Sequence, residues 1–212
     1  YGIASIPAAA LLARLGYSRA IIFALVTMVA GCLLVPIATI VDWYPGVLIA
    51  LFIIASGVTL LQVGANPLVA ALGPQKSSHA RLNFSQFFNS LGTTLGPLLA
   101  APILLTGGVF AADAVITDPA VRAESLRSID IAFLAVGLFF AVVAAFIFTA
   151  RKTINAAAPV PTAEDRMSPL VALKSPWAVF GALALFVYDG SEVTIGDLMS
   201  DFLHRPEILV IP

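Results

Sequence analysis

The sequence has little charge, a single cysteine and only two histidines. Charged residues make up 11% of its 212 positions and the formal net charge is -1, so nothing favours a nucleic-acid partner or a polybasic membrane anchor. Cys32 on its own excludes an internal disulfide framework and a multi-cysteine metal site, and we interpret it as a small buried hydrophobe. His79 and His204 lie outside the hydrophobic stretches, and before Asp189 these stretches contain no acidic pair and no histidine cluster. The sequence therefore predicts no catalytic residue, no metal site and no enzyme.

Long hydrophobic stretches dominate the chain instead. Hydrophobic residues account for 60% of it and the mean hydropathy is +1.01, which is more apolar surface than a soluble domain of this length can bury. At about 1.5 Å per helical residue, each of the four uncharged stretches covers the roughly 30 Å of a bilayer core. These stretches are 20–41, 44–75, 82–112 and 131–150, with a partial segment at 1–13 and a weaker one at 177–203. The pattern predicts an all-α, polytopic membrane helix bundle.

Basic residues divide unequally between the two sides of such a bundle. If the chain enters the cytoplasm after its first segment, the cytoplasmic connections carry most of the basic residues. This asymmetry fixes the orientation of the bundle in the membrane. The inside set is Arg14, Arg19, Lys76, Arg81, Arg151, Lys152, Arg166 and Lys174, and the outside set is Arg122, Arg127 and Arg205. Residues 151–176 are rich in Pro, Ala and charge, so they predict a cytoplasmic linker between two bundles.

Carboxamides lie inside two consecutive hydrophobic stretches, where lipid offers them no partner. Gln62 and Asn66 are spaced to share one helix face, and a polar stripe follows on the next helix. The stripe consists of Asn83, Gln86, Ser90, Thr93 and Pro97, with Asn89 and Thr94 at its edges. Single amides often only cross-link helices, with about 0.6 to 2 kcal/mol each. Two shared faces favour a ligand site instead, and uncharged donors and acceptors suit the hydroxyls of a sugar.

The last hydrophobic segment carries four carboxylates within residues 189–201. A carboxylate at the centre of a membrane helix costs about 2.5 to 3.5 kcal/mol, so part of this helix must face water or protein. Glu192 follows a mainly apolar run from Trp177 to Tyr188 and is our candidate for an ion-coupling group. The alternative is that this segment only lines an aqueous cavity.

Two segments, FIIASGVTLLQVGANPLVAALGP and RLNFSQFFNSLGTTLGP, resemble the sugar-porter branch of the major facilitator superfamily that contains fucose permease and the glucose/galactose transporters. The match runs over nearly the whole chain and corresponds to the second through seventh helices of a twelve-helix fold. The resemblance implies that 1–150 is an N-terminal six-helix bundle lacking its first helix, 151–176 the linker, and 177–212 the truncated start of the C-terminal bundle. It also implies two halves that rock about a central site, with Gln86 and Asn89 in the sugar site and Gln62 at a functional position.

The resemblance extends to a loop and has informative departures. ARLGYSR is similar to the superfamily's cytoplasmic loop motif and keeps Arg14, Gly16 and Arg19, which implies a conformational role, although Ala13 stands where an acid is usual. Fucose permease has a glutamate at the position of Gln62, whereas the glucose/galactose side has glutamine. Gln62 cannot take up a proton. Coupling to H+ or Na+ then needs one of three groups: Glu192, which matches an acidic position of the family's seventh helix, an acid in a first helix, or oxygen atoms that hold a sodium ion.

From these features we expect a secondary active transporter of a monosaccharide. The substrate is a hexose such as glucose or galactose, or fucose, bound by Gln62, Asn66, Gln86 and Asn89 and moved by cation-coupled symport with alternating access. We expect no cofactor besides the coupling ion, a location in the lipid bilayer of a bacterial inner membrane, and a monomer when full length. A sugar sensor or scaffold of the same fold without flux stays open, and a membrane-embedded enzyme is the less favoured alternative.

Overall fold

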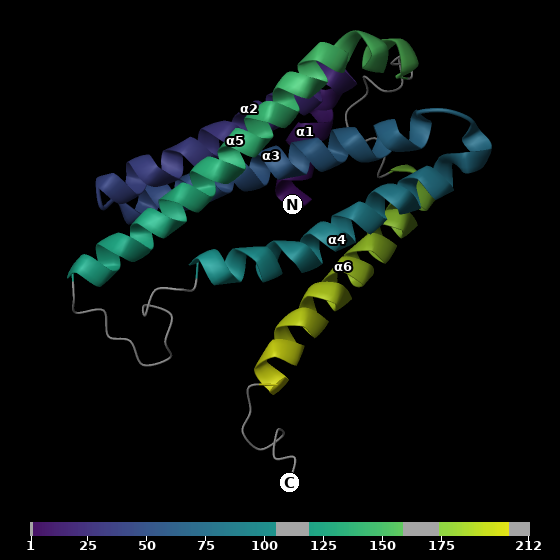
Figure 1. Ribbon diagram of the computed structural model, residues 1–212. Coiled ribbons are helices and arrows are strands. Elements are labelled where there is room, and N and C mark those ends of the chain that lie inside the picture. The colour runs from purple at the N-terminus through teal and green to yellow at the C-terminus, as the bar shows by residue number, and fades with distance from the viewer. Residues whose placement is uncertain (1, 105–118, 159–173, 204–212) are drawn as a thin grey trace. The chain divides into compact units, whose positions relative to one another are not determined.

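The computed structural model describes residues 2–104, 119–158 and 174–203, and within these ranges every element is helical (Figure 1). The elements are α1 (Gly2–Leu15), α2 (Tyr17–Ile40), α3 (Tyr44–Ala71), η1 (Gln75–Ser77), α4 (Ser78–Leu104), α5 (Pro119–Ala157) and α6 (Pro176–Leu203). The predicted all-α fold is confirmed. Residues 1–166 and 167–212 form two separate compact units, and α6 belongs to the second.

Glycine and proline mark the helix ends. Gly16 separates α1 from α2 with φ of +73°, and Gly73 follows α3 with φ of +102°, both in the left-handed region that side chains with a Cβ rarely adopt. Pro45 lies in the first turn of α3, where its missing N–H removes no helical hydrogen bond. The chain therefore turns where these residues interrupt the hydrophobic runs.

Three of the described helices are long and apolar enough to cross a membrane: α2, α3 and the Leu126–Ala157 part of α5. The sequence predicted further spans at 82–112 and 177–203, which correspond to α4 and α6. In α4 the polar stripe lowers the hydropathy of the described residues, and in α6 the described residues give an apolar segment at Pro176–Tyr188. Both still form long helices, with 27 residues in α4 and 28 in α6.

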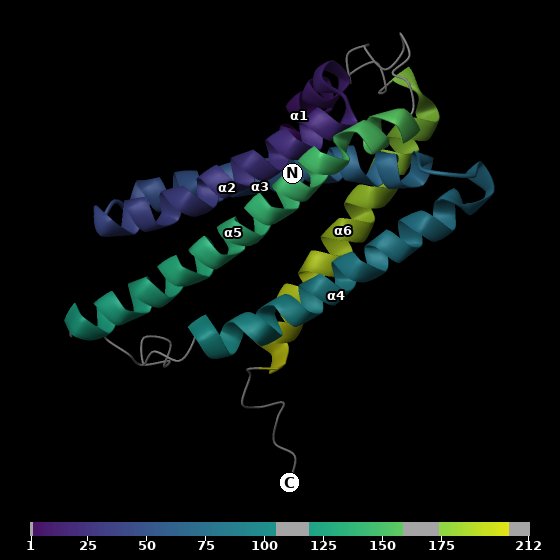
Figure 2. The ribbon, with the colours of Figure 1, turned by 45° about the horizontal axis from the view of Figure 1, so that its top comes forward.

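Helix α2 packs against α3 on one side and α5 on the other (Figures 1 and 2). The α2–α3 interface brings backbone against backbone at two glycines. A Cβ added at Gly31 would lie 3.0 Å from the Ala50 carbonyl oxygen, and one added at Gly57 would lie 2.9 Å from the Ala24 carbonyl oxygen. Small residues thus allow the close approach that drives helix association in membranes.

Larger apolar side chains fill the space around this close contact. Ile21, Leu25 and Met28 of α2 form a buried cluster with Leu68 of α3 and Ala144 of α5. Since α2 supplies most of this cluster and contacts both neighbours, it is the central helix of the three.

Helices α2 and α5 are antiparallel and are joined by hydrogen bonds near both ends. The Thr39 hydroxyl lies 2.9 Å and 3.0 Å from the two oxygens of the Asp130 carboxylate, to which it can donate, and also 2.9 Å from the Pro36 carbonyl oxygen of its own helix. At the opposite end, the Ser18 hydroxyl donates to the Arg151 carbonyl oxygen over 3.4 Å. Between these ends Cys32 is only 1% exposed, which confirms its interpretation as a small buried hydrophobe.

Helix α5 extends beyond the apolar stretch 131–150 at both ends. At its C-terminal end it continues to Ala157, so the beginning of the predicted linker 151–176 is helical. Adding a residue to an existing helix costs little, and Arg, Lys and Ala are good helix formers, so the helix continues after the apolar run has ended. The division between the two compact units falls after Arg166, inside the predicted linker.

Candidate functional site

Helix α4 presents most of its described side chains to the surroundings. This is clearest for the aromatic residues, since Phe84, Phe87 and Phe88 are 65%, 58% and 55% exposed. Their rings form T-shaped pairs, with centroids 5.1 Å apart for Phe84–Phe88 and 5.6 Å apart for Phe87–Phe88. The helix therefore offers an apolar surface directly beside its polar stripe.

The four predicted sugar-binding amides lie on α3 and α4. Gln86 and Asn89 are about one helical turn apart on α4, and both are exposed. On α3, Gln62 is exposed and Asn66, one helical turn further on, is half-buried. Among the described residues, no hydrogen bond involves any of these four amide side chains. The structure thus groups the predicted residues into two pairs on consecutive helices, and it shows no contact between the pairs.

The threonine hydroxyls of the polar stripe differ from the amides because their hydrogens already make hydrogen bonds. Thr93 donates to the Asn89 carbonyl oxygen at 2.8 Å, and Thr94 donates to the Ser90 carbonyl oxygen at 3.0 Å. Such bonds within a helix satisfy the hydroxyl hydrogen and leave the oxygen as an acceptor. The stripe therefore combines hydroxyl acceptors with amides that keep both donors and acceptors available.

Arg81 holds the turn that leads from α3 into α4. Its guanidinium donates to the carbonyl oxygens of Val69 at 3.1 Å, Ala70 at 2.6 Å and Pro74 at 3.0 Å, and to the Ser77 hydroxyl at 2.6 Å. These carbonyls lie at or beyond the end of α3, where helical partners are missing. Sequence reasoning counted Arg81 only as a cytoplasmic charge, although its position just after the Gly73-Pro74 turn was a signal for such a cap.

The predicted loop residues surround the tight turn between α1 and α2. Arg14 lies in the last turn of α1, Arg19 in the first turns of α2, and both are exposed. Gly16 connects the two helices, since its N–H donates to the Leu12 carbonyl oxygen at 2.9 Å and its own carbonyl accepts from Ala20 at 3.0 Å. The positive φ of Gly16 explains why glycine occupies this position.

Glu192, the predicted coupling residue, is part of α6. Its side chain lies outside the described residues, and α6 belongs to the second compact unit. Its coupling role therefore stays a prediction.

The sequence model of the Major Facilitator Superfamily matches residues 1–204. The chain belongs to the major facilitator superfamily. It is 36% identical to the glucose/galactose transporter of Brucella abortus biovar 1 (strain 9-941) over 212 residues, covering 98% of this chain and 48% of that protein. It is 40% identical to the L-fucose-proton symporter of Escherichia coli (strain K12) over 107 residues, covering 50% of this chain and 24% of that protein.

A solved structure shows the same family fold. The crystal structure of FucP, a major facilitator transporter in the outward conformation, matches with a TM-score of 0.56 and 28% identity, covering 87% of this chain and 44% of that one. This chain thus spans about half the length of the Brucella abortus relative, although almost all of this chain is matched. The predictions of an integral membrane protein, a partial major facilitator fold and a non-enzymatic family are confirmed.

Proposed function

We propose that this protein is a secondary active transporter of a monosaccharide, working by cation-coupled symport with alternating access. The substrate is a hexose such as glucose or galactose, or fucose. The observation that carries the proposal is the set of amide groups on α3 and α4, whose side chains make no hydrogen bond in the described part of the chain. Relatives named as glucose/galactose transporters and as an L-fucose-proton symporter support the substrate class.

The chemistry of the two helices suits a neutral, hydroxyl-rich ligand. Helix α3 carries no charged residue, and neither does α4 after Arg81. Gln62, Asn66, Gln86 and Asn89 would donate to and accept from sugar hydroxyls, as a carboxamide does both without net charge. An anionic substrate would lack a counter-charge on these helices.

The coupling ion is H+ or Na+, and Glu192 is the residue proposed to respond to it. Gln62 carries no titratable proton, so it takes no part in proton transfer. Arg14, Gly16 and Arg19 form the proposed conformational loop. The full-length protein would act as a monomer in the lipid bilayer of a bacterial inner membrane.

Sugar binding by the full-length protein tests the proposed site. Gln86→Ala should weaken binding of the transported hexose about tenfold or more, because sugar hydroxyls lose their partner. Gln75→Ala is the matched control, since Gln75 is an exposed carboxamide in η1 outside the stripe. Equal affinities of the two variants would remove Gln86 from the site.

Transport in vesicles tests the coupling. Glu192→Gln should abolish uphill, ion-driven uptake and leave sugar counterflow intact, because exchange needs no net ion movement. Normal uphill uptake by this variant would refute the role of Glu192. Sugar binding without any counterflow by the unmodified protein would support the sensor alternative instead.

A further inference from the structure

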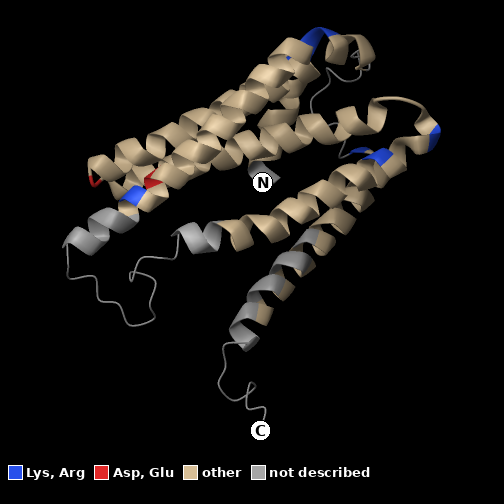
Figure 3. Ribbon diagram, viewed as in Figure 1, with Lys and Arg blue, Asp and Glu red and all other residues tan. Residues whose placement is uncertain are grey.

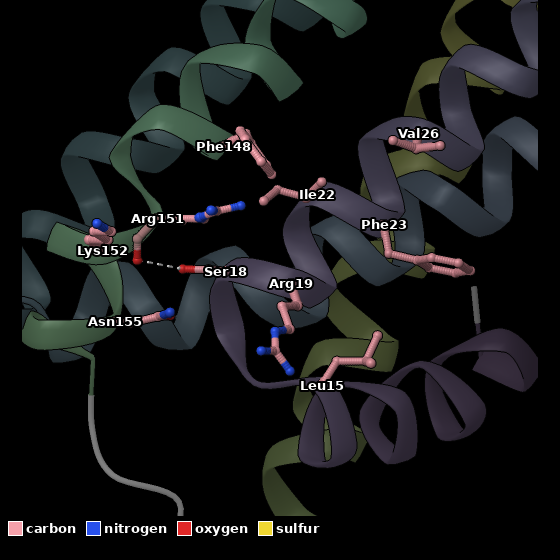
Figure 4. Close-up of a pocket in the computed structure, with 10 residues that line it drawn as sticks. All are labelled: Leu15, Ser18, Arg19, Ile22, Phe23, Val26, Phe148, Arg151, Lys152 and Asn155. Carbon is pink, nitrogen blue, oxygen red and sulfur yellow. Dashed lines mark hydrogen bonds between the residues drawn. The ribbon is translucent and has the colours of Figure 1, made fainter.

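A pocket of about 670 Å³ lies between the N-terminal half of α2 and the C-terminal part of α5, and no residue of the polar stripe lines it (Figure 4). Its polar part carries the cationic side chains of Arg19, Arg151 and Lys152. Its apolar part includes Ile22 and Phe148. The proposed sugar site uses none of these residues, although Arg19 also belongs to the conformational loop.

The three cations have no acidic partner in the described part of the chain. Helices α1 and α2 contain no Asp or Glu, and the described acidic positions of the α2–α5 pair lie at its other end (Figure 3). Asp130 is about 30 Å from Arg151 along α5, at about 1.5 Å per residue. Among the described residues, no acidic side chain of these helices therefore compensates the positive charge of the pocket.

Arg151 is placed so that its donors stay available. Its Cζ lies 3.9 Å from the centroid of the Phe148 ring, so the guanidinium stacks on an aromatic face. Stacking occupies the face of the group and leaves its edge N–H groups free, and these suit the oxygens of a phosphate. The Ser18 hydroxyl fixes the backbone beneath it by donating to the Arg151 carbonyl oxygen (Figure 4).

The pocket changes from cationic to apolar along the helices. On α2, Arg19 is followed by Ile22 and then Val26, about 10 Å further along at about 1.5 Å per residue. On antiparallel α5 the order is reversed, so Phe148 lies on the apolar side of Arg151 and Lys152. Both helices are long and apolar enough to span a membrane, so the apolar part points toward the bilayer interior.

We propose that this pocket binds the headgroup of an anionic phospholipid from the cytoplasmic leaflet. Arg151 would contact the phosphate through its edge N–H groups, Arg19 and Lys152 would add positive charge on either side of it (Figure 4), and an acyl chain would lie along Ile22 and Val26. The predicted orientation places this end of the helices in the cytoplasm, where anionic lipids attract basic residues. A soluble anion would use the cations but leave the apolar part of the pocket empty.

Native mass spectrometry of the full-length protein with phosphatidylglycerol and phosphatidylcholine tests this proposal. We expect phosphatidylglycerol to be retained in preference to phosphatidylcholine, and millimolar inorganic phosphate not to displace it. Arg151→Gln with Lys152→Gln should lower the affinity for phosphatidylglycerol about 25-fold, from about fivefold for each cation. Arg151→Lys with Lys152→Arg keeps both charges and should retain most of the affinity.

Lys76→Gln with Lys174→Gln is the matched control, because it removes the same charge from the same predicted side outside the pocket. It should leave lipid retention unchanged. An equal loss in both double variants, equal retention of the two lipids, or displacement by inorganic phosphate would each overturn the proposal. Elution volume and thermal unfolding confirm that the variants compared are folded.

Discussion

The α2–α3 interface and the exposed face of α4 contain the same small residue in opposite surroundings. A Cβ at Gly57 would meet the Met28 side chain and the Ala24 carbonyl oxygen, whereas a Cβ at Gly92 or Gly96 would meet nothing within 4 Å in the described residues. Gly57 is therefore closely packed, whereas Gly92 and Gly96, whose spacing is typical of helix packing, are open in the described residues. The packed region holds the helices together, and the open region carries two of the four amides, Gln86 and Asn89.

The largest difference in the free energy of unfolding should come from adding one methyl group at a packed glycine and at an open one. Gly57→Ala should destabilise the full-length protein by about 1 to 3 kcal/mol, because the added Cβ would lie 2.9 Å from a backbone oxygen. Gly92→Ala should be neutral or stabilise by up to about 1 kcal/mol, since alanine favours the helix. Thermal unfolding in detergent measures both. Equal destabilisation would show that α4 is packed in the intact protein and would contradict the difference between the two regions.

A smaller loss of stability should follow when the hydrogen bonds that Arg81 makes at the turn between α3 and α4 are removed. Arg81→Gln should destabilise by about 2 kcal/mol, because carbonyl oxygens at the end of α3 lose a charged donor. Lys76→Gln is the control on the same turn, as Lys76 is exposed. If both variants unfold at the same temperature as the unmodified protein, the Arg81 contacts do not stabilise the start of α4.

The smallest effect should come from one hydrogen bond at the edge of the packed region. Thr39→Val should destabilise by about 1 kcal/mol, because Asp130 loses the hydroxyl donor. Thr27→Val is the same change on the same helix, where the hydroxyl donates only to the Phe23 carbonyl oxygen of its own helix. Chemical unfolding midpoints of the two variants should differ, and identical midpoints would contradict the α2–α5 link.

The helices could be predicted from the sequence, but the contacts between them could not. Hydrophobic runs and the Gly16 and Gly73 turns reflect local chemistry, so the helices and their order were predictable. Which glycine packs is decided by another helix: Gly92 and Gly96 have the spacing typical of helix packing and are open in the described residues, whereas Gly57 has no small residue four positions away and is closely packed. The four amides were predicted as site residues because polar side chains are unusual inside apolar runs. Arg81 was missed because its partners are backbone carbonyls, which every sequence contains.

The contacts of Gly31 and Gly57 also limit how α2 and α3 can move past each other. Each glycine lies against the backbone of the opposite helix, so sliding along the axis would drive the Ile54 or Met28 side chain into that backbone. A shift of one turn is about 5.4 Å and would put side chains with a Cβ where the glycines now lie, so we expect the two helices to move together. Under alternating access, the motion would then have to occur at other surfaces, such as the open side of α4.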